Sequence, residues 1–102
     1  MATLEVSLTE QGYLHLPAEL ARQYFPHDLL AAITRPREVW LMPTRGAGAG
    51  GLILKQRNAQ GDRSVLIWHL LPPDTAPGVR AAFWDEANGA LRVALTEVGG
   101  RR

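Results

Sequence analysis

Hydrophobic and polar residues alternate at the start of the chain, as they do in a strand with one buried face. Leu4–Leu8 places its two leucines and its valine on one side and polar residues on the other. The same period of two returns in Tyr13–Leu16, whose leucines point opposite to His15. Polar Thr9–Gly12 separates the two stretches as a turn. The sequence therefore predicts a hairpin here.

A short helix is predicted to follow this hairpin, over residues 17–24. Pro17 ends the strand because it has no N–H to donate, and proline is well tolerated in a first helical turn. Good or fair helix formers follow, with Glu19 near the positive end of the helix dipole. Phe25 precedes Pro26, and the residue before a proline is disfavoured in the α region, so the helix ends there.

Three further pairs of apolar stretches predict three further hairpins. Leu29–Ile33 and Val39–Met42 are joined by a polar connection. Leu52–Arg57 and Ser64–Leu71 flank a turn-rich cluster, which predicts a long hairpin. The last pair consists of Val79–Trp84 and Leu91–Leu95, with an Asn-Gly turn signal between them.

These elements predict a mainly β fold, a small β-barrel-like or sandwich domain of successive hairpins with one short helix. A chain of 102 residues suits a single domain. Within it we expect one half over residues 1–45, a Gly/Ala loop over 46–51 and a β-hairpin half over 52–97. The loop lacks bulky side chains, so burial would not offset the entropy lost on ordering it.

Composition narrows the classes of protein to which the chain can belong. Hydrophobic residues make up 46% of the chain, which favours a folded globule over a disordered tail. There is no cysteine, so disulfides and thiolate metal sites are excluded. No apolar run approaches membrane-spanning length, and we expect a cytoplasmic protein without membrane contact. The net charge of +1 produces no global field that would attract nucleic acid.

No pattern of titratable residues indicates catalysis, a metal or a cofactor. His15, His27 and His69 are far apart in sequence and lack ligand spacing, so surface or packing roles are the simpler interpretation. Asp85-Glu86 lies in a predicted turn, where both side chains are expected to stay solvated and to point in different directions. The glycines of 46–51 lack the ending of a phosphate-binding loop. We therefore predict no catalytic, cofactor or metal residues.

Tryptophans and cations supply the remaining candidates for binding. Trp40, Trp68 and Trp84 each lie in a predicted strand, where core packing is expected and an outward ring would indicate an interface. Basic residues gather near two predicted hairpins, where a solvated surface and an anion or nucleic-acid contact both fit. The candidate binding residues, including one from the predicted helix, are Arg22, Arg35, Arg37, Arg45, Lys55, Arg57 and Arg63.

Residues 4–43 also resemble the AbrB/MazE-type swapped-hairpin family. That family has a strand, a glycine turn, a strand ending in Leu-Pro, a short helix and a second hairpin ending near a proline. The matching residues here are Gly12, Leu14, Leu16, Pro17, Glu19, Leu20, Arg22, Asp28, Val39, Leu41 and Pro43. The resemblance implies an intertwined homodimer and often DNA binding by a regulator or antitoxin. The first hairpin tip, Thr9–Gly12, lacks the cations of DNA-binding members, and the second half is not covered.

Three functions follow from these patterns, in order of preference. The first is a non-catalytic module that binds another macromolecule as a small accessory or regulatory protein. The second is sequence-specific DNA binding by an AbrB-like dimer, with Arg22, Arg35 and Arg37 nearest for phosphate contact. The third is a small hydrolase. We also expect a homodimer, because a two-stranded hairpin is marginal in water and a second copy would supply neighbouring strands.

Overall fold

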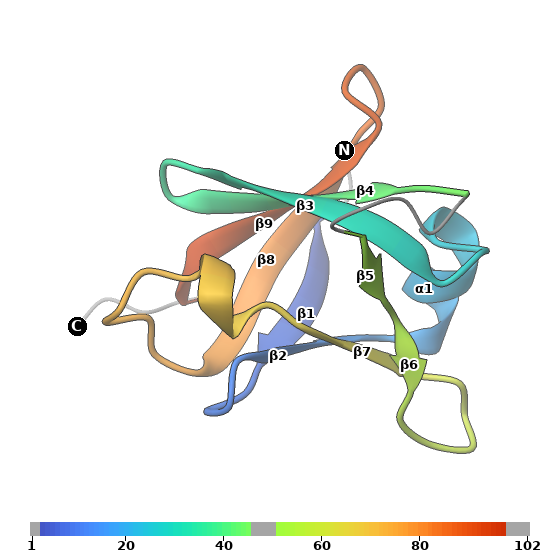
Figure 1. The fold of residues 1–102 in the computed structure, drawn as a ribbon, viewed down its shortest axis with the longest axis horizontal. Helices are drawn as coiled ribbons and strands as arrows, with labels where there is room; N and C mark the ends of the chain where they lie inside the picture. The colour runs from blue at the N-terminus through green and yellow to red at the C-terminus, as the bar shows by residue number, and fades with distance from the viewer. Residues whose placement is uncertain (1–2, 46–50, 98–102) are drawn as a thin grey trace.

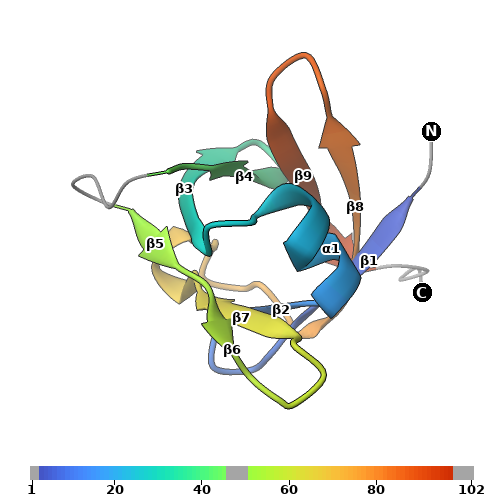
Figure 2. The ribbon, with the colours of Figure 1, turned by 90° about the vertical axis from the view of Figure 1, so that its right-hand side faces the viewer.

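The computed structural model describes residues 3–45 and 51–97, which form one antiparallel sheet curled into a nearly closed barrel (Figures 1 and 2). The sheet order is β5-β3-β4-β9-β8-β1-β2-β7-β6. The strands are β1 (Leu4–Leu8), β2 (Tyr13–Leu16), β3 (Leu29–Arg35), β4 (Glu38–Pro43), β5 (Leu52–Ile53), β6 (Lys55–Gln56), β7 (Arg63–Leu66), β8 (Gly78–Asp85) and β9 (Ala90–Glu97). The helices are α1 (Ala18–Tyr24) and the 3-10 helix η1 (Trp68–Leu70). The mainly β, barrel-like prediction is confirmed.

The predicted first hairpin is present, and both of its edges are paired within the chain. Ser7 lies opposite His15 across β1 and β2. Along its other edge β1 pairs with β8, and β2 pairs with β7. The strands that we expected a second copy to supply are therefore present in the same chain. The hairpins β3–β4 and β8–β9 are also formed as predicted.

Strands from the two ends of the sequence alternate around the barrel. Four ladders join residues up to 45 to residues from 52 onward, because β4 pairs with β9, β1 with β8, β2 with β7, and β3 with β5 (Figure 1). The predicted 46–51 loop connects the two ranges and, apart from Gly51, lies outside the described residues. Most of the sheet is consequently held by long-range pairing.

The predicted long hairpin over 52–57 and 64–71 is wrong in most of its length. Only two residue pairs join β6 to β7, because the chain changes partner at Leu54 and β5 pairs with β3 instead (Figure 2). Leu54 is buried, and its N–H donates to the carbonyl of Asp28. After Leu66 the chain turns into η1 rather than continuing as a strand. The short stretch 52–56 thus bridges the two ends of the sheet and nearly closes the barrel.

Helix α1 starts one residue later than predicted and ends as predicted at Tyr24. Pro17 precedes the helix and has no side chain that can cap it, but Asp62 Oδ1 accepts from the Ala18 N–H at 2.8 Å. A carboxylate from the β6–β7 connection therefore supplies the N-terminal hydrogen bond that the local sequence lacks. At the other end, the Tyr24 ring stacks on Trp84 with ring centroids 4.4 Å apart.

The inward-facing side chains form one apolar core. It collects alternate residues from most strands together with Leu20 of α1 and Phe25, which follows α1. The buried charged residue Arg80 also faces inward, where its guanidinium donates to the backbone carbonyls of Leu95 and Ala76. Among the described residues no helix is both long enough and apolar enough to cross a membrane.

Candidate functional site

The outward-facing residues of β1, β2 and β7 form a continuous surface on one side of the barrel. We define the β2–β7 face as Ser7, Tyr13, His15, Ser64, Leu66 and Trp68. Strand pairing sets its order, because His15 lies between Ser7 and Ser64, and Tyr13 lies opposite Leu66. Alternation in β2 sends Leu14 and Leu16 into the core and leaves Tyr13 and His15 outside.

Three large apolar side chains on this face are exposed to solvent. Tyr13 is 40% exposed, Leu66 37% and Trp68 62%. Among the other described residues, the large hydrophobic side chains that are exposed are those of Ile33, Ile53 and Val79. Tyr13 and Leu66 are register partners, and Trp68 lies against Gly12, the residue before Tyr13, so we treat these three exposed side chains as one apolar cluster.

Trp68 also borders a hollow of about 410 Å³ between η1 and the β1–β2 turn. Gly12 makes this contact close, because a Cβ on Gly12 would lie 2.1 Å from Trp68 Cβ. The Ile67 N–H donates to the Gly12 carbonyl at 2.9 Å and holds η1 against the turn. The hollow is completed by Glu10, Gln11, His69, Leu71, Pro72, Pro73 and Thr75.

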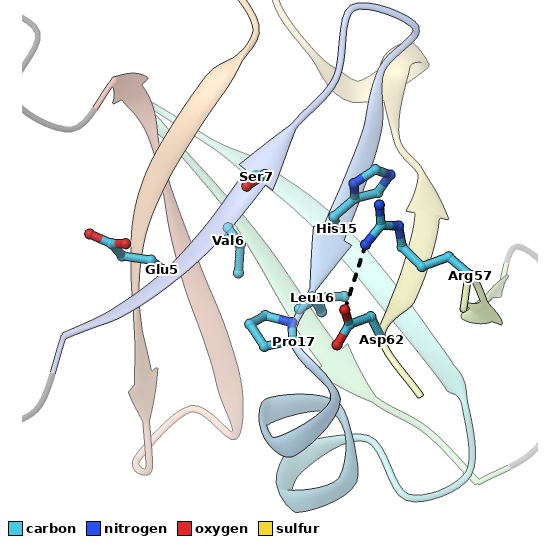
Figure 3. A pocket seen from close by; sticks show the side chains of 8 residues that line it. All are labelled: Glu5, Val6, Ser7, His15, Leu16, Pro17, Arg57 and Asp62. Atoms are coloured by element: carbon cyan, nitrogen blue, oxygen red, sulfur yellow. Dashed lines mark ion pairs between the residues drawn. The ribbon is translucent and has the colours of Figure 1, made fainter. Parts of the chain in front are cut away.

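A second, more polar hollow of about 270 Å³ lies further along β2. Figure 3 shows the imidazole of His15 beside the guanidinium of Arg57, with Asp62 below them. Arg57 NH1 is 3.6 Å from Asp62 Oδ2. Burial lowers the pKa of His15, the positive charge of Arg57 lowers it further, and Asp62 acts in the opposite direction.

A cluster of three charged side chains, Arg92, Glu38 and Asp85, lies elsewhere, on the outer surface of β4, β9 and β8. Arg92 donates to Glu38 at 3.0 Å and to Asp85 at 3.1 Å, and its guanidinium covers both Trp40 and Phe83. Burial alone raises the pKa of Glu38, but hydrogen bonds from Trp40 and Arg92 bring that pKa below its ordinary value. These contacts join register partners on three strands. The cluster therefore links the outer surfaces of β4, β9 and β8 and stabilises this part of the sheet.

This cluster corrects the expectation that Asp85 and Glu86 are both solvated. The Asp85 side chain is only 13% exposed because Arg92 and Asn88 donate to it. The hydrogen bond from Asn88 is the main reason that the pKa of Asp85 is lowered. Glu86 turns to another partner and accepts from Trp84 Nε1 at 2.8 Å. The two carboxylates do point in different directions, as expected.

The seven predicted binding cations do not gather at one place. Arg57 and Arg63 form ion pairs with Asp62 and Asp28. Arg35 lies over the Trp40 ring, 4.9 Å from its centroid. The three cations named for phosphate contact are divided, because Arg35 and Arg37 lie at the β3–β4 turn and Arg22 lies in α1, at the opposite end of the view in Figure 1. Arg22, Arg37, Arg45 and Lys55 are all exposed.

Sequence reasoning found some members of the β2–β7 face and missed others. Alternation predicted that His15 points outward, and Tyr13 shares that side of β2. It placed Trp68 in a strand, whereas Trp68 begins η1 and is exposed. His27 is exposed in a loop, and His69 lies in η1. Among the described residues, no group of three or more His, Cys, Asp or Glu side chains is placed to hold a metal ion.

Comparisons with known proteins found no match for this chain. No protein-family model matches the chain, and no curated protein or solved structure matches it either. The resemblance of residues 4–43 to the AbrB/MazE-type family therefore stays a prediction.

Proposed function

We propose that this domain is a non-catalytic binding module that docks a protein partner on its β2–β7 face. The observation that carries the proposal is the exposed apolar cluster of Tyr13, Leu66 and Trp68. Exposed apolar clusters of this kind mark interaction surfaces more often than isolated exposed residues do. Tryptophan and tyrosine also dominate the binding energy of protein interfaces, since each covers a large area with few rotatable bonds.

The backbone beneath the cluster is well held, which favours docking without rearrangement. Tyr13 and Leu66 lie on paired strands. Trp68 is fixed at its backbone by the close approach of Gly12. A rigid surface loses little conformational entropy when a partner binds, so more of the contact energy appears as affinity. The hollow beside Trp68 offers room for an apolar side chain of the partner.

Site-specific photo-cross-linking in the source cells tests this proposal. A photo-reactive phenylalanine at position 68 should yield one discrete heavier adduct. The matched control is the same residue at position 33, because Ile33 is exposed on β3 outside the face. After the partner is identified by mass spectrometry and purified, Trp68→Ala should weaken binding at least about thirtyfold, as expected for a hot spot of about 2 kcal/mol. Ile33→Ser should leave the affinity unchanged.

Each of the other outcomes overturns the proposal. Absence of an adduct at position 68, or equal adducts at positions 68 and 33, means that the face has no dedicated partner. An adduct of about 22 kDa, twice the chain mass of 11.2 kDa, assigns the face to self-association instead. Unchanged affinity after Trp68→Ala, in a variant with native circular dichroism, removes Trp68 from the interface.

The homodimer and DNA binding remain separate predictions. The first hairpin is already flanked by β8 and β7, so a dimer needs a surface other than these strand edges. Sedimentation velocity at micromolar concentration should show a species of about 22 kDa, and a monomer of 11.2 kDa would contradict the dimer.

For the prediction of DNA binding, a gel shift on duplexes from the flanking operon region should weaken steeply as the salt concentration rises. No shift at low salt would contradict DNA binding.

A further inference from the structure

We propose that the hollow lined by Ser7, His15 and Arg57 binds an oxyanion, either a carboxylate or a phosphate group. Three hydrogen-bond donors from three parts of the chain line it. Ser7 and His15 are register partners on β1 and β2, and Arg57 follows β6. A hydroxyl, an imidazole and a guanidinium are the groups that proteins commonly use to bind oxygen anions.

The donors of this hollow are largely uncommitted. Among the described residues, neither the Ser7 hydroxyl nor the His15 imidazole is hydrogen-bonded to another protein group. The Arg57 guanidinium has a contact with Asp62 at 3.6 Å, longer than a charge-assisted hydrogen bond of about 2.7–2.9 Å. Several N–H groups of Arg57 are thus free to meet an incoming acceptor.

The carboxylate of Asp62 does not compete strongly for these donors. It already accepts from the Ala18 N–H at 2.8 Å and from Asn58 Nδ2 at 2.9 Å. These two hydrogen bonds lower the pKa of Asp62, and the bond from Asn58 has the larger effect. The Asp62 carboxylate is consequently stabilised by the first N–H of α1 and by the Asn58 amide as well as by Arg57. The remaining carboxylate of the lining, Glu5, points away from His15 and Arg57 (Figure 3).

A bound anion should leave a recognisable trace on His15. Burial and the charge of Arg57 lower the pKa of His15, and Asp62 opposes them. Lys55 is the further cation nearby, because its strand partner Ser64 is also the strand partner of His15. An anion between His15 and Arg57 offsets the positive charge and favours the imidazolium. Binding should therefore raise the pKa of His15.

Nuclear magnetic resonance on the full chain tests the proposal. Sodium phosphate and sodium acetate are titrated separately at constant ionic strength, with sodium chloride as the balancing salt. We expect saturable shifts of the His15 imidazole and Arg57 Nε–H signals and a higher pKa of His15. His27 and His69 are internal controls, since they lie outside the hollow and should show no saturable shift.

The two titrations distinguish the two sources of the anion. Saturation by phosphate alone assigns the site to a phosphoryl group, and saturation by acetate assigns it to a carboxylate. Absence of saturation by either, or equal shifts at all three histidines, overturns the proposal.

Variants test whether the site is built from these residues. Arg57→Gln should weaken binding at least about tenfold, because it removes a charge-assisted hydrogen bond. The matched control Arg22→Gln, an exposed arginine in α1, should bind as the native chain does. His15→Phe places an apolar ring in the hollow and should also abolish binding. Native binding by either Arg57→Gln or His15→Phe, with an unchanged amide spectrum, contradicts the proposal.

Discussion

At the scale of single residues, Gly12 has an environment that restricts the position to glycine. Its φ is +88°, and a Cβ there would lie 2.1 Å from Trp68 Cβ and 2.7 Å from Trp68 Cα. Backbone cannot yield as the end of a flexible side chain can, so η1 and the β1–β2 turn would have to separate. Glycine is therefore required at this position both for its backbone conformation and for the contact.

Gly12→Ala should lower the free energy of unfolding by about 2–3 kcal/mol, measured by urea denaturation. Gly89→Ala is the matched control, because Gly89 also has a positive φ, +60°, but no atom lies within 4 Å of its added Cβ. The control should lose only about 1 kcal/mol from backbone strain. Equal losses in the two variants would show that the contact with Trp68 contributes nothing.

A second residue-scale prediction concerns pH. The pKa of Asp62 lies below its ordinary value of 3.8, so near that pH the folded chain binds fewer protons than the unfolded chain. The stabilisation is complete above pH 3.8 and disappears as pH falls through the folded pKa. Asp62→Asn should thus lower the melting temperature at pH 7, and the difference from the native chain should narrow below pH 3.8.

Thermal melts followed by circular dichroism over a pH series check this prediction. Asp74→Asn serves as the control, because Asp74 is exposed in the loop before β8 and should produce no pH-dependent difference. A constant gap between the Asp62 variant and the native chain at every pH would mean that the amide, rather than the charge, is responsible.

At the scale of elements, the stretch 52–56 decides whether the barrel closes. Side chains on its two faces have opposite environments, since Leu54 is 3% exposed and Ile53 is 56% exposed. Leu54→Ala should lower the free energy of unfolding by about 3 kcal/mol, because it leaves a cavity where β5 ends and β6 begins. Ile53→Ala should cost less than about 1 kcal/mol. Urea denaturation of both variants provides the measurement, and similar losses would contradict the bridging role of Leu54.

At the scale of the whole molecule, the pairing of β1 with β8 and of β4 with β9 makes both ends of the chain interdependent. Neither residues 1–45 nor residues 52–97 can complete the sheet alone. We therefore expect a single cooperative domain. In native-state hydrogen exchange, the slowest amides of β1 and β4 should open with the same free energy as those of β8 and β9. Earlier opening of all strands after residue 52 would indicate a separate unit.

The candidate site was only partly predictable from the sequence, because some of its residues are placed by local alternation and others by contacts between distant segments. Alternation within β2 alone predicts that the His15 side chain points away from the core, without knowledge of the strands beside it. The partners of His15 in its hollow depend on contacts distant in sequence, since Arg57 and Asp62 are more than forty positions away. Arg57 was selected from the sequence as one of seven cations, but no local pattern relates it to His15. Trp68 was assigned to a strand because Ile67 and Trp68 continue an apolar run that suits either conformation.

The sequence by itself determined the local elements, because strand alternation, turn residues and the proline at position 17 act within a few residues. It predicted β1–β2, β3–β4, β8–β9 and α1 close to their observed bounds. Tertiary structure alone decided how these elements combine. The change of partner at Leu54, the capping of α1 by Asp62 and the pairing of both chain ends are interactions between distant segments. Each of them depends on three-dimensional proximity, which the spacing of residues along a chain does not encode.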